Sequence, residues 1–364
     1  MKKQHFLWLL GGYVTASFFL ASTTPITPHE AYNLYEGRGF VSTLMQWGNA
    51  IVPGFLGLRI FFILFAFLSL RIFYELSQRY FSRREDVYLS TALFMFLPGI
   101  LTATSLANVG IIVLALVLFF VLLYERKHYT LLPLIMLALF FVHEASVIFF
   151  VALFFYGIRY RDKPMIIVSA GFILAFVYLS KGIEIGGRPS GHFLEIFGLY
   201  AAVFSPLLFL YFFYTMYRIL LRGRKTLMWY ISFTALAVSL LLSIRQRVYI
   251  TDFAPYVMIS TIAMVDVFMH SLRVRLPQFR KRYLRAFYVV IAVLTLSVGA
   301  IIFHQPLYYL SGDKTHHFAA RLYQPYDLAH SLHQKEIKCY DATGRKQLQL
   351  RYYGIASCTD VFIW

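Results

Sequence analysis

The sequence predicts an all-α polytopic membrane protein with about eleven transmembrane helices. Of its 364 residues, 59% are hydrophobic and 19% are aromatic, and the mean hydropathy is +0.65, as in membrane proteins rather than soluble domains. A transmembrane helix needs about 20 mostly apolar residues, and such runs follow one another as far as residue 303. We therefore expect a transmembrane domain over residues 1–303 and a small extracytoplasmic module over residues 304–364.

The formal charge of +17 is distributed in a way that orients the protein. Most of the Lys and Arg residues fall in alternate short loops between apolar runs, which is the pattern of the positive-inside rule. These loops and the N-terminus are expected in the cytoplasm, and the protein in a bacterial inner membrane. Because orientation accounts for the charge, the sequence does not indicate a nucleic-acid partner.

The chain begins with MKK and a long apolar run, 5–22, which resembles a signal peptide. Since the run is long and many others follow, we expect it to remain as the first span, with Lys2 and Lys3 in the cytoplasm. The polar stretch TTPITPHEAYNLYEGRG at residues 23–39 is then extracytoplasmic. Within this outer loop, 23–55, residues 40–51 are expected to form a helix lying along the membrane interface.

One later segment, 131–156, fits either a single long helix or a hairpin of two short helices broken at His143-Glu144. A single crossing would move every later basic cluster to the outside, whereas a hairpin keeps them inside, so a hairpin is predicted. The expected spans are 5–22, 56–74, 87–104, 108–124, the two arms of 131–156, 165–179, 199–217, 227–244, 254–272 and 287–303.

The tail after residue 303 contains both cysteines of the chain, Cys339 and Cys358. On the oxidising side of a membrane, two such cysteines can pair and staple a small module. The sequence alone does not decide between a disulfide and two free thiols.

The polar residues that could carry chemistry collect at the predicted outer face. His29 and Glu30 follow the end of the first span, where a carboxylate can act as a general base. Thr27, Pro28 and Glu30 also have the pattern of a helix N-terminus with a capping box. The two roles are compatible, because a cap also fixes a catalytic carboxylate.

A second group, Arg245 and Arg247, lies on a short outer segment beside Tyr249 and Asp252. Paired guanidinium groups bind phosphate through bidentate hydrogen bonds, and the alternative is that they reach toward lipid headgroups. The dipeptide at 143–144 lacks the spacing of a metal-binding motif, so no metal is expected. No other cofactor is expected either. Further candidates at the outer face are Tyr32, Glu36, His143, Glu144 and Arg188.

Five segments stand at marked positions among the spans and loops: TPHEAYNLYEG, FVHEASVIFF, RQRVYITDFAPYV, YDLAHSL and KCYDATGRKQLQLRYYGI. In this order of features the chain resembles the C-type integral-membrane glycosyltransferases, in particular the protein O-mannosyltransferase and lipid A aminoarabinose transferase relatives. The resemblance covers most of the chain as a pattern of spans and loops. The family's first outer loop carries an Asp-Glu pair that falls on His29-Glu30, so a His stands where the basic Asp is expected.

The resemblance implies transfer of a sugar from a polyprenyl-phosphate-sugar donor to a glycan, lipid or protein acceptor at the extracytoplasmic face. Arg245 and Arg247 would hold the donor phosphate, and attack from the opposite side of the anomeric carbon would invert its configuration without a metal. Glu30 is the first candidate for the base, His29 is the second because a neutral imidazole is competent, and an inactive member is the third.

Three other functions fit parts of the sequence. A lipid-linked oligosaccharide polymerase or ligase would have a long late outer loop, whereas the longest one here is 245–253. A transporter would have internal repeats and broken helices at the midplane, and no repeat is evident in the sequence. A non-catalytic membrane subunit remains open because the family's Asp is missing.

Overall fold

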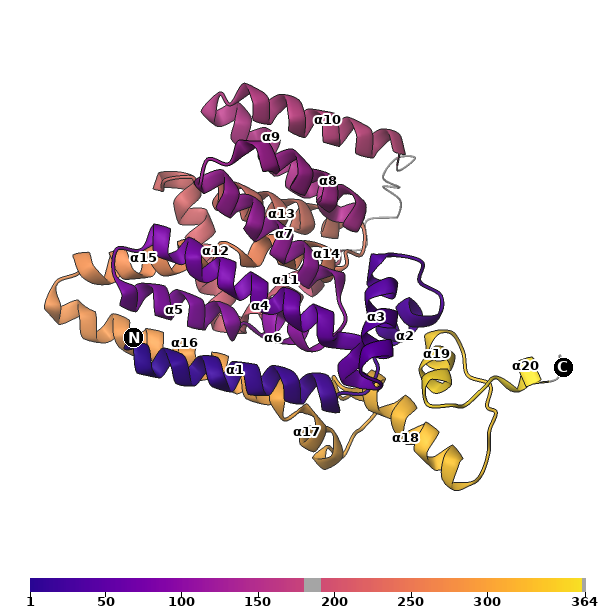
Figure 1. The fold of residues 1–364 in the computed structure, drawn as a ribbon. Helices are drawn as coiled ribbons and strands as arrows, with labels where there is room; N and C mark the ends of the chain where they lie inside the picture. The colour runs from indigo at the N-terminus through magenta and orange to yellow at the C-terminus, as the bar shows by residue number, and fades with distance from the viewer. Residues whose placement is uncertain (180–190, 362–364) are drawn as a thin grey trace. The chain divides into compact units, whose positions relative to one another are not determined.

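The computed structural model describes residues 1–179 and 191–361. This part of the chain is helical except for its turns, loops and one isolated β-bridge between Cys339 and Ala356, as expected for an all-α protein. The chain divides into two compact units, whose helices are labelled in Figure 1. Unit 1 comprises Met1–Tyr13, Phe65–Leu101 and Val109–Val298, and unit 2 comprises Val14–Leu64, Thr102–Asn108 and Gly299–Trp364.

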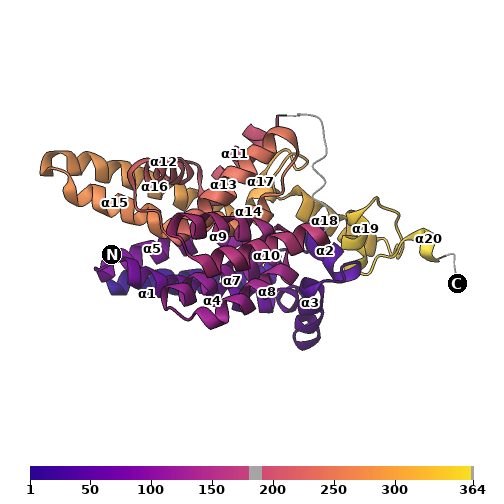
Figure 2. The same cartoon turned by 90° about the horizontal axis from the view of Figure 1, so that it is seen from above.

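Unit 1 is a bundle of apolar helices in which α9 lies between α10 and α13 (Figures 1 and 2). α7 is apolar on every side, and 12 of its 17 residues are buried, as expected for a helix inside a bundle. The helices of this unit are α5 (Arg84–Met95), α7 (Val109–Glu125), α8 (Leu132–Val142), α9 (Val147–Tyr160), α10 (Lys163–Leu179), α11 (Phe193–Phe204), α12 (Pro206–Arg222), α13 (Leu227–Arg245), α14 (Ile250–Met258), α15 (Thr261–Val274) and most of α16 (Pro277–Ile302), with two 3-10 turns, η1 (Tyr129–Leu131) and η2 (Glu144–Ser146). Residues of α1 (Lys3–Thr23), α4 (Phe55–Tyr80) and α6 (Pro98–Ser105) belong to both units.

The chain turns back at His143, as predicted for the hairpin. α8 ends one residue earlier, His143 has extended backbone, and η2 leads into α9. The ring centroids of Tyr124, at the end of α7, and Tyr129, just before α8, are 5.8 Å apart. The hydroxyl of Tyr124 lies 3.3 Å from the hydroxyl of Tyr156, near the end of α9. The start of α8 and the end of α9 are therefore at the same end of unit 1.

Three of the expected spans are bent pairs of helices rather than single helices. The bends measure 60° between α5 and α6, 107° between α11 and α12, and 44° between α14 and α15. The sharpest bend is at Ser205, whose φ is +81°. Pro206 follows and lacks the N–H that would continue the helix, so the segment 199–217 cannot form one straight helix.

Four of the described helices, α1, α4, α13 and α16, are long and apolar enough to cross a membrane. The number rises to seven if each bent pair counts as one span, and three shorter apolar segments occur as well. The helices support an integral membrane protein, while the count of eleven remains a prediction. α16 begins at Pro277, ten residues before the expected span, because the basic segment 277–286 continues the same helix.

Unit 2 packs the tail of the chain with the polar loop that follows α1. α19 packs against α2, and the tail has its own small apolar core formed by Leu332, Leu350 and Ile355. Cys339 and Cys358 form a disulfide, so the pairing left open by the sequence is present. In this grouping the tail shares contacts with the loop, and the domain boundary at residue 303 stays a prediction. The remaining helices of the unit are α2 (Pro28–Tyr35), α3 (Phe40–Ile51), α17 (His304–Leu310), α18 (Ala320–Gln334), α19 (Arg345–Tyr352) and α20 (Cys358–Val361).

Helix α3 covers the residues predicted for the interfacial helix and touches α4 at a pair of glycines. A Cβ atom on Gly48 would lie 2.1 Å from the carbonyl oxygen of Gly57, so only glycine fits this contact. Phe40, Trp47 and Ile51 are exposed on one side of α3, since they are seven and four residues apart. An exposed apolar face with a Trp is typical of a helix lying in the membrane interface.

Replacing a glycine inside a helix by alanine usually stabilises a protein, but at Gly48 we expect the replacement to destabilise it. Gly48→Ala should lower the free energy of unfolding by about 1–3 kcal/mol, because the new methyl overpacks the contact between α3 and α4. Gly299→Ala in α16 is the control, because its Cβ would meet open space, and alanine favours a helix there. Denaturant unfolding in detergent would compare the two, and equal stability of both variants would contradict the close contact.

Candidate functional site

The helix that carries His29 and Glu30 begins where the sequence predicts. Thr27 is the N-cap of α2, and its hydroxyl oxygen accepts a hydrogen bond of 3.0 Å from the Glu30 amide. The Glu30 carboxylate accepts one of 2.9 Å from the Thr27 amide in return, and Pro28 occupies the first turn. This is the predicted capping box, which satisfies two backbone donors at the helix start.

Glu30 is buried and forms an ion pair with Arg59 of α4. Arg59 donates to both carboxylate oxygens, from Nε to Oε1 at 2.8 Å and from Nη2 to Oε2 at 2.7 Å. The Ala107 amide donates a further hydrogen bond to Oε1 at 2.7 Å. The Arg59 and Glu30 side chains are 0% and 1% exposed. With the Thr27 amide, four donors converge on this carboxylate.

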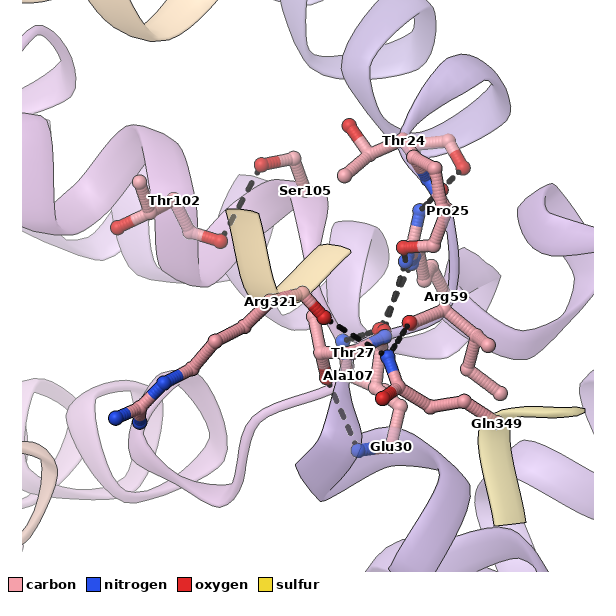
Figure 3. Close-up of polar contacts among 12 residues, drawn as sticks. Thr24, Pro25, Thr27, Glu30, Arg59, Thr102, Ser105, Ala107, Arg321 and Gln349 are labelled. Atoms are coloured by element: carbon pink, nitrogen blue, oxygen red, sulfur yellow. Dashed lines mark hydrogen bonds and ion pairs between the residues drawn. The ribbon is translucent and has the colours of Figure 1, made fainter. Parts of the chain in front are cut away.

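The remaining donors of Arg59 are satisfied by the backbone at the end of α1. Nη1 donates to the carbonyls of Ala21 and Thr24 at 3.0 and 2.8 Å, and Nη2 donates to Pro25 at 3.1 Å. Figure 3 shows the guanidinium group beside the carbonyls of Thr24 and Pro25. All five N–H groups of Arg59 therefore have acceptors, so one side chain joins α1, α2 and α4.

Sequence reasoning missed Arg59 because it lies inside the apolar run at 56–74. The available signal was the ionisable residue itself, since such residues inside apolar spans are candidates for function by default. Its partner could not be read from the sequence, because 29 residues separate it from Glu30.

The surroundings of Glu30 keep it ionised. Burial raises the pKa of this carboxyl, but the charge of Arg59 and the hydrogen bonds from Arg59, Ala107 and Thr27 outweigh burial and hold the pKa below its ordinary range. A carboxylate with a lowered pKa and four donors is a weak base. The geometry therefore favours a positioning role for Glu30.

The tail also holds the start of α2. Gln349, which is 2% exposed, donates to the Ile26 carbonyl at 2.8 Å and also reaches the Arg321 carbonyl (Figure 3). The Ile26 amide donates to the Tyr353 hydroxyl at 3.2 Å. Arg345 lies over the Tyr32 ring, 4.9 Å from its centroid. The loop that carries the candidate residues is thus bound by side chains from α4 and from α19.

The other candidates of this loop share one exposed face. His29, Tyr32 and Glu36 are all exposed and stand three and four residues apart along α2 and its C-cap. Residues with that spacing lie on one side of a helix. Glu30 points into the unit instead, so the two members of the His29-Glu30 pair have different surroundings.

In unit 1, Arg247 is engaged by a carboxylate that the sequence analysis did not single out. Glu195 of α11 accepts from Arg247 Nη2 at 2.9 Å, and its other oxygen lies 2.9 Å from His192 Nδ1. Arg247 and Glu195 are 71% and 37% exposed, so solvent screening makes their ion pair weak. Arg245, the last residue of α13, is exposed as well.

Of the remaining candidates at the predicted outer face, His143 and Asp252 lie close together. His143 Nε2 lies 3.4 Å from Asp252 Oδ1, within ion-pair range but without hydrogen-bond alignment. Glu144 and Tyr249 are exposed, and Arg188 lies outside the described residues. Among residues 1–179 and 191–361, no group of three or more His, Cys, Asp or Glu side chains has the arrangement of a metal site.

A protein of known structure has a similar fold. The chain is similar to ArnT from Cupriavidus metallidurans, seen in a crystal structure in the apo state, with a TM-score of 0.58 and 12% identity. The match covers 98% of this chain and 89% of that one. The chain therefore has a fold like that of ArnT over nearly its whole length. No family model matches the chain, and no curated protein matches it.

The buried pair predicts a large difference between two arginines of the same helix. Arg59→Met should lower the free energy of unfolding by about 3–5 kcal/mol, because it leaves the Glu30 charge buried and unpaired. Arg71→Met in α4 is the matched control, since Arg71 is 68% exposed and lies 3.8 Å from Glu75. Thermal or denaturant unfolding of both purified variants would measure the difference, and similar losses would argue against the buried pair.

Proposed function

We propose that the chain is a membrane glycosyltransferase that moves a sugar from a polyprenyl-phosphate donor to an acceptor at the extracytoplasmic face. The observation that carries this proposal is the fold likeness to ArnT, which extends over 98% of the chain. The polar outer loop of unit 2, held rigidly by Arg59, adds support, because catalytic side chains need a fixed support. The sidedness rests on the positions of the basic loops, which favour a bacterial inner membrane with the site facing the periplasm.

We assign the base to His29 and a positioning role to Glu30. His29 is exposed on α2 and stands where the family's Asp is expected. A neutral imidazole is a competent base near pH 7, whereas the Glu30 oxygens already accept hydrogen bonds from Arg59, Ala107 and Thr27. This order reverses the one suggested by the sequence alone, and the burial of Glu30 is the reason.

Arg245 and Arg247 are proposed to bind the donor phosphate. The ion pair between Arg247 and Glu195 is exposed and weak, so a phosphate group can displace the carboxylate. Phosphate offers more oxygens than a carboxylate and carries more charge, which favours bidentate binding to guanidinium.

The proposed reaction is a single displacement. An acceptor hydroxyl or amine gives its proton to His29, and its oxygen or nitrogen forms a bond to the anomeric carbon. The bond from that carbon to the phosphate oxygen breaks on the opposite side, and the polyprenyl phosphate leaves with the electron pair. The configuration inverts, and because a phosphate is a stable leaving group, the proposal includes no metal.

Loss of the imidazole should remove the chemistry and leave the fold intact. In membranes supplied with a lipid-linked sugar, His29→Ala should lower transfer at least about 100-fold, which is the contribution of a general base. His316→Ala, an exposed histidine of the tail, is the control and should retain activity. Normal transfer by His29→Ala would remove His29 from the role, and the amount of folded protein would be checked in parallel.

The donor site predicts a change in KM. Arg245→Ala Arg247→Ala should raise the KM for the lipid-linked donor by about tenfold or more, because charged hydrogen bonds to phosphate are lost. Glu195→Gln keeps both arginines and removes the carboxylate charge that competes with phosphate for Arg247. The KM of this variant for the donor should therefore stay the same or fall. If the double variant keeps the donor KM of the original protein, the phosphate is bound elsewhere.

A further inference from the structure

A cavity of about 800 Å³ opens at one end of unit 1, where α4, α7, α9 and α12 end and α13 begins. Its volume is within the range of about 300–1,000 Å³ found for small-molecule sites. Leu227 at the start of α13 lines the cavity, whereas Arg245 is the last residue of that helix. The 19 residues of α13 span about 28 Å. The cavity is therefore separate from the arginines assigned to the donor.

The lining of this cavity is strongly basic. Five cationic side chains face two carboxylates, Glu125 and Asp266, which leaves a formal charge of +3 with His270 neutral. The cations come from two parts of the chain, the end of α4 and the segment from α12 to α13. They are Arg79, Arg218, Arg222, Arg224 and Lys225.

None of these five cations forms an ion pair with a carboxylate among the described residues. Glu125 accepts a 3.0 Å hydrogen bond from Tyr80, and Arg218 donates to the Ser271 hydroxyl at 2.9 Å. Arg222 and Arg224 are exposed, and no ion pair to either occurs within residues 1–179 and 191–361. Their charge is available to an anion from outside the chain.

Membrane orientation accounts for basic loops at this end, but it does not require them to line one cavity. The basic start of α16 is a useful contrast. Lys281 and Arg282 are exposed on that helix and belong to the same unit, yet they do not line the cavity. Arg79, at the end of α4, meets Arg222 and Arg224 around one defined space, and this convergence is a feature of the fold, beyond the charge of the loops.

We propose that this cavity binds a phosphate-bearing ligand through Arg222 and Arg224, at the end of unit 1 expected to face the cytoplasm. Guanidinium groups bind phosphate oxygens in pairs, and Lys225 adds a third positive charge. The phosphate belongs either to an anionic phospholipid headgroup or to a free phosphorylated molecule. The site does not depend on the proposed transfer reaction, because it uses none of the residues assigned to that reaction.

The test uses the full chain in nanodiscs and two probes. Calorimetry with inorganic pyrophosphate, in discs of neutral phosphatidylcholine, reports a free phosphate. Native mass spectrometry of protein released from discs containing phosphatidylglycerol reports a retained lipid headgroup. The cavity variant is Arg222→Gln Arg224→Gln, and Lys281→Gln Arg282→Gln is the matched control with the same loss of charge.

At least one probe should bind the original protein saturably, and the probe that does so identifies the source of the phosphate. The cavity variant should bind that probe about tenfold more weakly or worse, while the control binds it normally. Equal weakening in both variants would mean that surface charge alone attracts the anion, which overturns the proposal. Absence of saturable binding of both probes would overturn it as well.

Discussion

The ion pair between Arg59 and Glu30 is the constraint on which the polar loop of unit 2 depends. Moving two charges out of water costs several kcal/mol for each ion, so such a pair persists only when its remaining donors and acceptors are satisfied. Arg59 meets this condition with five hydrogen bonds, and Glu30 meets it with four. The pair thereby fixes the end of α1 and the start of α2 against α4.

This constraint separates two roles that the sequence places side by side. A general base needs a pKa near the working pH, whereas Arg59 and the other donors hold the pKa of Glu30 below its ordinary range. His29 is one position away and exposed on the rigid helix. The carboxylate thus supports the loop, while its exposed neighbour is left for the role proposed above.

Local signals predicted much of the fold. The capping box at Thr27, the helix at 40–51 and the break at His143 each follow from residues close together in sequence, and the Cys339–Cys358 disulfide was among the expected outcomes. Long-range partners were not predictable in this way. Arg59 meets Glu30, and Arg247 meets Glu195, only after folding. The bend at Ser205 was missed because a Ser-Pro pair inside an apolar run is a weak local signal.

The central claim is that Arg59 and Glu30 act as one structural unit, and a double-mutant cycle tests it most directly. The free energy of unfolding would be measured for Arg59→Met, Glu30→Met and the double variant. Removing both charges leaves no unpaired ion, so the double variant should be clearly more stable than the sum of the two single losses predicts. Additive losses would mean that the two side chains are independent, and this would contradict the account.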